Sequence, residues 1–242
     1  MIKQILIAGL AASSLAAAGS ASAADIDITN VDGIWTATNP GASVVSGLNT
    51  NLIEWGDPAT NDGPSGYQFT NATTPFPVTI GTEFNLGTFT HFNFPVFPPS
   101  LESAELTVSS TIQIDGVSQM ISSVFDFTHF ETTNNLNPCP DGGANGSGVN
   151  VNGCADRVTI ALNSGASQSF TVGGVEYFVD ITGFLFGGEF ATEFWTTEEA
   201  ENEATLRGVV RAASVPEPGT LALLGLGLLG LGFKKKLSKA AA

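Results

Sequence analysis

The strongest constraint on the fold is a two-residue alternation of apolar and polar side chains along the middle of the chain. Val108, Ile112 and Ile114 share one face of residues 105–115, and polar side chains occupy the other face. Residues 175–184 repeat the pattern. Because successive side chains of a β-strand point to opposite faces, the alternation predicts strands with one face in a core and one in solvent.

No segment of ten or more residues between residues 24 and 213 shows a helical period. The best candidate, residues 191–208, is acidic, and Trp195-Thr196-Thr197 interrupts its pattern. Turn clusters such as Asp115-Gly116 separate the short strands at roughly even spacing. We therefore predict an all-β chain whose residues 24–213 form a single antiparallel β-sandwich of jelly-roll type.

Residues 1–23 have the three parts of a secretory signal peptide. A basic start at Lys3 is followed by an apolar stretch to about residue 18 and by the small residues Ala21-Ser22-Ala23. A buried N-terminal helix is the alternative, but the order and lengths of the parts favour a signal. We expect cleavage after Ala23 and a mature protein that leaves the cytoplasm.

Residues 214–242 are also tripartite. Pro216-Glu217-Pro218 precedes an apolar run from Leu221 to Phe233, and four lysines follow. Thirteen helical residues span about 20 Å, which is short of the roughly 30 Å hydrocarbon layer of a membrane. Lysines beside such a segment stay cytoplasmic, which places the main domain outside. We expect a short sorting helix that enters the membrane only before processing.

This C-terminal segment resembles the PEP-CTERM sorting signal of Gram-negative bacteria. In that family a membrane transpeptidase, exosortase, processes the chain at the Pro-Glu-Pro motif and passes it to the cell surface or exopolysaccharide. The resemblance implies that Pro216, Glu217 and Pro218 are the recognition residues and that exosortase is a partner. The tail is rich in lysine where arginine is usual, which keeps its charge. A tail anchor that is never cut is the alternative.

The part of the chain between the two signals is strongly acidic. Residues 24–213 hold 22 acidic residues against three arginines, Arg157, Arg207 and Arg211, for a formal charge of −19. Such a charge disfavours binding to nucleic acid or to anionic membrane surfaces. It favours divalent cations, or neutral partners held by non-ionic contacts.

Five short motifs are spread over this acidic part. They are Gly33–Thr36, Ile53–Gly56, Gly87–His91, Phe127–Thr132 and the loop from Cys139 to Cys154. Together they resemble the domain family called choice-of-anchor K, which occurs in surface proteins with PEP-CTERM or other sorting tails. The resemblance implies a surface protein, and it implies no activity or catalytic residues.

The chain has two cysteines, Cys139 and Cys154, around a loop rich in glycine and asparagine. In an oxidising compartment we expect a disulfide, since no CxxC spacing indicates a redox site. In the chain-entropy model a loop of about 15 residues gains about 3 kcal/mol from closure. Asp141, Asn145 and Asp156 offer oxygen ligands for calcium, but they do not fit the EF-hand pattern. A glycine-rich surface turn without a resident metal or cofactor is the preferred interpretation.

Sequence signatures of catalysis are missing. The chain has no GxSxG, HExxH or P-loop motif. Among 22 acids some pair would meet glycosidase spacing by chance, and we interpret the run Glu198, Glu199, Glu201 and Glu203 as a solvated face. We therefore predict that the protein is not an enzyme.

Five aromatic residues are candidates for stacking on sugars, with core packing as the preferred interpretation. They are Trp35, Trp55, Tyr67, Tyr177 and Trp195. The leading functional hypothesis is an exported surface or matrix protein with a structural or adhesive role in exopolysaccharide or biofilm. A secreted carbohydrate-binding module or glycan-active enzyme is the alternative.

The sequence Phe-Thr-His-Phe occurs twice and contains both histidines of the chain, His91 and His129. In strands, His91 shares a face with Phe89, and His129 shares one with Phe125 and Phe127. A metal pair would require neighbouring strands in register and a further ligand, and the sequence marks neither. We predict buried, hydrogen-bonded histidines, with a metal site as the alternative. Replacing either by glutamine should then lower stability and leave zinc binding unchanged.

Overall fold

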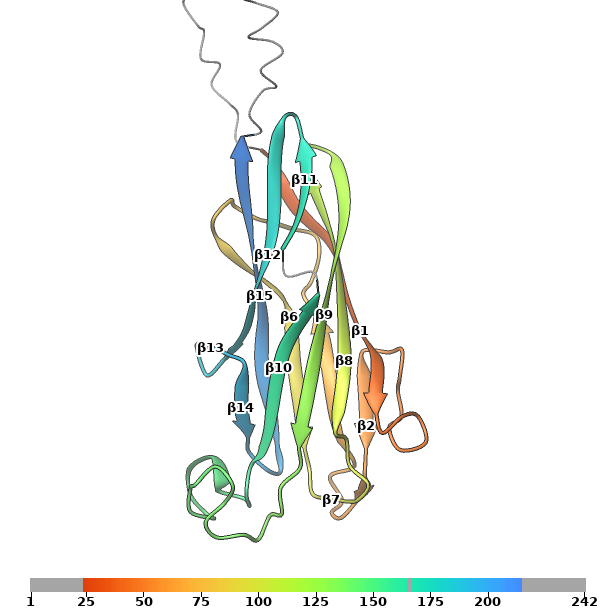
Figure 1. Ribbon diagram of the computed structural model, residues 1–242, viewed down its shortest axis with the longest axis vertical. Coiled ribbons are helices and arrows are strands. Elements are labelled where there is room, and N and C mark those ends of the chain that lie inside the picture. The colour runs from red at the N-terminus through yellow and green to blue at the C-terminus, as the bar shows by residue number, and fades with distance from the viewer. Residues whose placement is uncertain (1–23, 165–166, 215–242) are drawn as a thin grey trace, which may run out of the picture.

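The computed structural model describes residues 24–164 and 167–214 (Figure 1). These residues form two antiparallel β-sheets that face each other, which confirms the predicted all-β sandwich. Within these ranges the one helical element is a single 3-10 turn, Gly148–Asn150, and no helix is long and apolar enough to cross a membrane. The expected signal peptide and C-terminal sorting helix, at 1–23 and 215–242, lie outside the described residues.

The first sheet has six strands in the order β14-β10-β9-β8-β1-β5. Asp115 and Gly116 both have positive φ, 48° and 82°, so the turn between β8 and β9 is the tight kind that matches the twist of paired strands. The strands are β1 (Ile26–Asn39), β5 (Phe76–Pro77), β8 (Ser103–Ile114), β9 (Val117–Phe130), β10 (Asp156–Ser164) and β14 (Glu193–Thr196).

The second sheet has seven strands, in the order β11-β12-β15-β6-β4-β2 with β13 paired to β12. They are β2 (Leu52–Trp55), β4 (Ser65–Asn71), β6 (Glu83–Asn93), β11 (Ser167–Val172), β12 (Val175–Phe186), β13 (Glu189–Ala191) and β15 (Ala200–Ser214). A separate short ribbon joins β3 (Asp57–Pro58) to β7 (Val96–Phe97). Residues 191–208 contribute to strands, as the broken helical pattern predicted.

The alternation in the sequence corresponds to burial. Along β8 every second side chain is buried, and Leu106, Val108 and Ile112 lie in the core. β12 follows the same rule only to the β-bulge between Ile181 and Gly183, after which Phe184 is buried. A bulge inserts one residue and therefore changes which face the following side chains occupy.

The two ends of the sandwich differ in what they carry (Figure 1). At the terminal end, β1 begins and β15 finishes, and the Asp25 backbone N–H bonds to Asp115. At the loop end, the chain leaves β9, forms the loop of residues 131–155 and returns in β10, and β14 turns into β15. The fifteen residues of β15 run between the two ends, and at about 3.3 Å per residue they span about 50 Å.

Candidate functional site

The two histidines meet across the core at the loop end. His91 lies near the end of β6 and His129 near the end of β9 in the facing sheet, and their ring centroids are 5.3 Å apart at right angles. Both are buried, on the same faces as Phe89 and Phe127, as predicted. We expected that two histidines could meet only on neighbouring strands in register. That expectation is wrong, because side chains that point inward from two facing sheets are also in contact.

Aromatic rings surround the pair on the core side. Trp55 stacks on His91 with centroids 5.9 Å apart and meets the edge of His129 at 5.2 Å. Tyr67 lies 4.9 Å from the His91 ring. Edge-to-face and stacked rings at these separations pack favourably, and they fix the orientation of both imidazoles.

This packing decides which aromatic residues are available to sugars. Trp35, Trp55, Tyr67 and Tyr177 are at most 4% exposed, so their ring faces are not open to a ligand. Core packing was therefore the right interpretation for four of the five candidates. Trp195 is partly exposed, because it lies on the outer face of β14.

His129 is hydrogen-bonded through both ring nitrogens. Its Nδ1 lies 2.8 Å from the Tyr67 hydroxyl, and its Nε2 lies 3.2 Å from Glu131 Oε2 and 3.9 Å from Asp156 Oδ2. Burial, and then the negative charges of Asp156 and Glu131, raise the pKa of Tyr67 well above its ordinary value. The phenol therefore keeps its proton.

The hydrogen bonds of His91 define its tautomer. The Thr196 hydroxyl donates its one hydrogen to the Asp156 carbonyl oxygen at 3.1 Å, so it accepts from His91 Nδ1 at 3.0 Å. Burial, and then the neighbouring His129, lower the pKa of His91 well below its ordinary value, so the ring is neutral. His91 Nε2 therefore presents a lone pair, and it has no hydrogen-bond partner among the described residues.

Three carboxyl groups complete the site. Asp156 begins β10, Glu131 follows the last residue of β9, and Glu198 lies in the turn between β14 and β15. One carboxyl oxygen of each lies within 4.8 Å of the other two. Burial, and then the neighbouring charges of Glu131 and Glu198, raise the pKa of Asp156 well above its ordinary value.

Glu198 is fully buried, so its assignment to a solvated face is wrong, although Glu199, Glu201 and Glu203 are exposed. Glu199 has a φ of 54° and reverses the chain, and the Asn202 side chain bonds Thr197 on both its N–H and its carbonyl. The turn thereby directs one acid of the run inward.

Burial, and then the charge of Glu131, raise the pKa of Glu198 to about 8. The amides of Asn134 and Asn93 partly oppose this rise, although neither forms a hydrogen bond of normal geometry with the carboxylate. Glu198 is thus poised to hold a proton near neutral pH.

Unpaired acceptors are concentrated at this site. In the described part of the chain, ten buried side-chain nitrogen or oxygen atoms have no hydrogen-bond partner, and six of them belong to the site. They are His91 Nε2, Asn93 Oδ1, Asn134 Oδ1, Asp156 Oδ2 and both oxygens of Glu198. Trp55 Nε1, a buried donor beside the histidines, is also without a partner. Buried polar groups are normally paired, so the loop end is where a water molecule or an ion would complete the hydrogen bonding.

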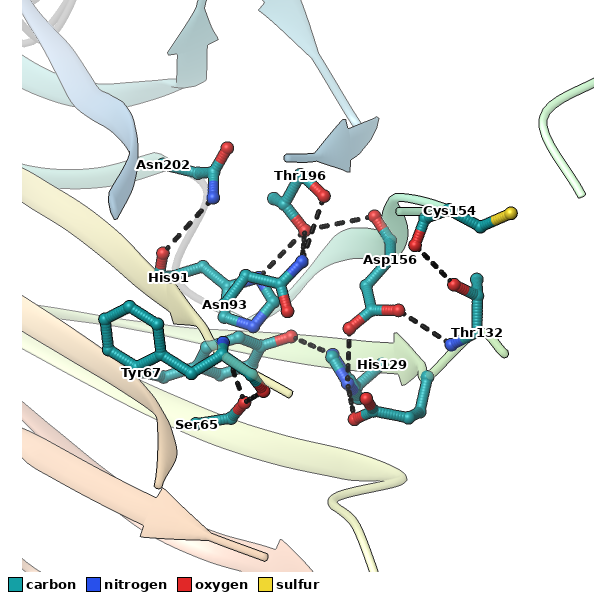
Figure 2. A network of polar contacts seen from close by, with 12 residues as sticks. Ser65, Tyr67, His91, Asn93, His129, Thr132, Cys154, Asp156, Thr196 and Asn202 are labelled. Carbon is teal, nitrogen blue, oxygen red and sulfur yellow. Dashed lines mark hydrogen bonds and ion pairs between the residues drawn. The ribbon is translucent and has the colours of Figure 1, made fainter. Parts of the chain in front are cut away.

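The disulfide between Cys139 and Cys154 forms as predicted. It closes the loop two residues before Asp156, and the Thr132 hydroxyl bonds the Cys154 carbonyl at 2.6 Å while the Thr132 N–H bonds Asp156 Oδ1 at 2.7 Å (Figure 2). The cross-linked loop therefore holds the Asp156 carboxylate in place.

The proposed calcium ligands of this loop have separate partners. The Asp141 carboxylate accepts from the Asn150 amide and the Gly143 N–H, and the Asn145 amide donates to backbone carbonyls. Asp156 instead faces the histidines. Calcium binding by this loop stays an untested alternative to the preferred glycine-rich turn, and these contacts give it no support.

A hollow of about 560 Å³ opens beside the site. Its lining includes Pro95, Val96, Glu131, Thr132 and Asn134. The Glu131 side chain is 23% exposed and contacts His129, so it connects the hollow to the buried groups. The hollow is therefore the solvent-accessible space next to the buried groups.

Sequence reasoning found the histidines but not their surroundings. Glu198 was assigned to another role, Asp156 to another site, and Asn93, Asn134 and Thr196 to none. These residues share a position at or near the end of a strand. That position indicates a common site only when it is known which strands of the two sheets face each other.

Comparison with known families locates a second functional region. Residues 214–236 match the PEP-CTERM protein-sorting motif, which includes Pro216, Glu217 and Pro218. The match supports an exported protein that is anchored transiently in the membrane and processed by exosortase. The curated proteins gave no significant match to the chain. The motif starts at Ser214, the last residue of β15, and so follows directly from the terminal end.

Proposed function

We propose that the protein is a non-catalytic component of the cell surface or extracellular matrix, with a structural or adhesive role in exopolysaccharide or biofilm. The observation that carries the proposal is the sorting motif, which begins where the last strand of an acidic sandwich ends. Processing at Pro216–Pro218 would leave the whole sandwich intact and attached by its terminal end. The resemblance of the middle of the chain to choice-of-anchor K domains agrees with a surface role.

The charge of the sandwich supports the same role. Its three arginines each lie within 4.0 Å of an acidic residue, in the pairs Arg157–Glu193, Arg207–Glu83 and Arg211–Asp180. Nineteen acidic residues remain in excess. Such surfaces repel one another and attract cations, so the protein would join a hydrated matrix through neutral glycans or bridging cations.

The intact mass of the protein from its native host tests the sorting step. We expect a chain that begins near Ala24 and has lost the basic tail after Pro216–Pro218. A Glu217→Ala variant should keep the tail, whereas Glu201→Gln, which alters an exposed acid on β15, should be processed normally. A wild-type chain that still ends in Lys-Leu-Ser-Lys-Ala-Ala-Ala would contradict the proposal.

A pull-down with exopolysaccharide from the producing organism tests the matrix role. We expect the folded protein to be retained without generating new reducing ends. Absence of retention by the exopolysaccharide would refute an adhesive role. New reducing ends would show a glycan-active enzyme instead.

Glycan binding through stacking is a second candidate, favoured by one surface feature. Phe130, Arg157 and Trp195 are direct neighbours on β9, β10 and β14, and the guanidinium lies 5.3 Å and 5.8 Å from the two ring centroids. Phe130 is 45% exposed. The guanidinium lies over both rings and covers part of their faces, so a sugar would meet its N–H donors together with the remaining ring surface. A Trp195→Ala variant should then lose exopolysaccharide retention, while Phe190→Ala, which alters an exposed ring on β13, should keep it.

A further inference from the structure

The buried groups at the loop end come from both sheets and form two overlapping groups that share Asp156. One ligand atom each of His91, His129 and Asp156 lies within 4.8 Å of the other two, and Glu131 and Glu198 join Asp156 in an overlapping group. We call these five residues the loop-end cluster. We propose that the loop-end cluster binds a divalent transition-metal ion of the zinc class, with His91 Nε2, His129 Nε2 and Asp156 Oδ2 as ligands and with Glu198, which lies beside Asp156, reaching the fourth position by a side-chain rotation. This inference is independent of the proposed function.

The free atoms of the cluster are nitrogen and oxygen atoms of the kinds that bind metal ions. His91 Nε2 is a lone pair because Nδ1 carries the hydrogen that Thr196 accepts. Asp156 Oδ2 and both oxygens of Glu198 are buried and have no hydrogen-bond partner among the described residues. Leaving buried acceptors unpaired costs free energy, and a coordinated cation removes that cost for all of them together.

One pair of ligand atoms has nearly the spacing of coordinated ligands, and the other pairs within each group lie within 4.8 Å. Ligands at about 2.0–2.2 Å from a tetrahedral zinc ion lie about 3.4 Å from one another. His129 Nε2 and Asp156 Oδ2 are 3.9 Å apart. A contraction of about half an ångström, within the reach of side-chain rotations, brings this pair to the distance of coordinated ligands.

The clustered carboxyl groups of the site favour the binding of a cation. Three carboxyl groups lie together and two of them are fully buried, whereas the nearest basic groups are the two imidazoles. Ionised carboxylates are very costly to bury without a partner. A divalent ion neutralises two of them and displaces protons that they would otherwise hold.

A second layer of hydrogen bonds already orients the ligands (Figure 2). His91 is hydrogen-bonded through Nδ1 to the Thr196 hydroxyl, and His129 through Nδ1 to the Tyr67 hydroxyl at 2.8 Å. The Thr132 N–H donates to Asp156 Oδ1. When Nε2 of His129 binds an ion, Nδ1 carries the hydrogen and donates to the Tyr67 oxygen. Such outer partners are what metal sites use to fix the tautomer and angle of each ligand.

The ligand types select the metal. Imidazole nitrogen suits zinc, iron, nickel and copper, whereas calcium and magnesium take oxygen ligands almost alone. A set of two imidazoles and two carboxylates therefore favours the transition-metal class, with zinc as the probe. This reverses the expectation from sequence that glutamine at either histidine leaves zinc binding unchanged and that no metal is resident.

A bound ion would cross-link the sandwich. Its ligands come from β6 in one sheet, from β9 and β10 in the other, and from the turn that precedes β15. The site would therefore fasten the two sheets together at the end opposite the sorting motif, next to the disulfide. Its effect would be on the stability of the exported protein.

Zinc titration of the exported protein after chelation and dialysis tests the proposal. We expect one zinc ion per chain by calorimetry and by elemental analysis. At a hundredfold excess of zinc over the dissociation constant, the melting temperature should rise by about 5–10 °C. Calcium at the same concentration should give no rise. No zinc uptake, or equal stabilisation by calcium, would overturn the proposal.

Two variants and a control identify the ligands. His91→Gln and Glu198→Gln, which preserve volume, should each weaken zinc binding by roughly tenfold to a hundredfold. Glu203→Gln, an exposed acid on β15, should bind zinc like the wild type. Wild-type affinity in both cluster variants would contradict the assignment.

Cobalt(II) binding to the wild-type protein keeps the assignment testable if those variants fail to fold. We expect visible absorption bands of four-coordinate cobalt that disappear when zinc is added. A spectrum like that of hydrated cobalt would count against the site.

Discussion

The two ends of the sandwich share one fold and differ in their interiors. At the terminal end the buried side chains are aliphatic, such as Ile26, Ile28 and Ile114. At the loop end the corresponding inward positions carry His91 and His129 with buried acids beside them. An apolar interior is sufficient to hold the sheets together, so the polar interior of the loop end needs another explanation. A bound cation is the one that its chemistry supports.

The ends also differ in how they connect to the rest of the chain. The sorting motif follows β15 at the terminal end, so that end faces the membrane before processing. The loop end, about 50 Å away along β15, carries the disulfide and the loop-end cluster. Attachment and cross-linking are therefore separated along the long axis of the molecule.

The largest expected effect comes from the apolar interior. Ile112→Ala removes a fully buried side chain near the terminal end and should lower the free energy of unfolding by about 2–5 kcal/mol. Urea denaturation measures this, and the loss should be the same with and without zinc. Thr111→Ala, on the outer face of β8, is the matched control and should cost much less. If the decrease in the free energy of unfolding caused by Ile112→Ala depended on zinc, the two ends would not be energetically separate.

The disulfide should rank second. Replacing both Cys139 and Cys154 by serine should cost about 3 kcal/mol, as expected for a loop of about 15 residues. Because the loop positions Asp156, zinc affinity should also fall. Thermal denaturation and zinc titration of the variant check the two effects. Unchanged zinc affinity would show that the cluster does not depend on the loop.

The pH dependence of the free energy of unfolding should reflect the buried titratable groups of the loop end. Glu198 has a folded pKa of about 8 against 4.5 when unfolded, so folded protein holds more protons between these values. The free energy of unfolding that this difference in pKa contributes is fully present below pH 4.5, and it is lost as pH rises toward 8. His91 has the opposite effect because its pKa is lowered in the folded protein. Below pH 6.5 the unfolded chain binds a proton at this histidine that the folded chain does not, so the free energy of unfolding decreases as pH falls.

Between about pH 7 and 8 the buried acids Glu198 and Asp156 therefore outweigh His91, and metal-free protein should lose stability as pH rises. Zinc-loaded protein should not lose stability in this range, because protons compete with the ion and deprotonation favours it. Chemical denaturation at several pH values measures both trends. Glu198→Gln should flatten the metal-free profile, and a profile that stays steep would assign the titration to another group.

The smallest effect is expected at the surface of the terminal end. Arg211 is 66% exposed in its side chain and lies 3.0 Å from Asp180. Exposed ion pairs contribute about 0–1 kcal/mol, so Arg211→Ala should change the free energy of unfolding by no more than that. Measuring it at low and high salt checks the assignment. A loss comparable to that of Ile112→Ala would mean that surface charge stabilises this end.

The local structure could be predicted because it depends on neighbouring residues. The alternation in β8, the Asp115-Gly116 turn and the burial of both histidines all follow from the period of a strand and from turn chemistry. With two cysteines in an exported chain, the Cys139–Cys154 pairing had no competitor.

The cluster could not be predicted because it depends on which strands face one another. His91 and His129 meet only because β6 and β9 lie in opposite sheets. The burial of Glu198 depends on the positive φ of Glu199 and on the anchoring amide of Asn202, neither of which an acidic run indicates. Long-range pairing, rather than residue type, decided these positions.

A crystal structure of the zinc-soaked protein, with diffraction collected on both sides of the zinc absorption edge, would show directly whether the loop-end cluster holds an ion. We expect one anomalous peak at the loop end, within coordination distance of His91 Nε2, His129 Nε2 and Asp156 Oδ2. An empty cluster, or zinc bound only to exposed acids, would contradict it.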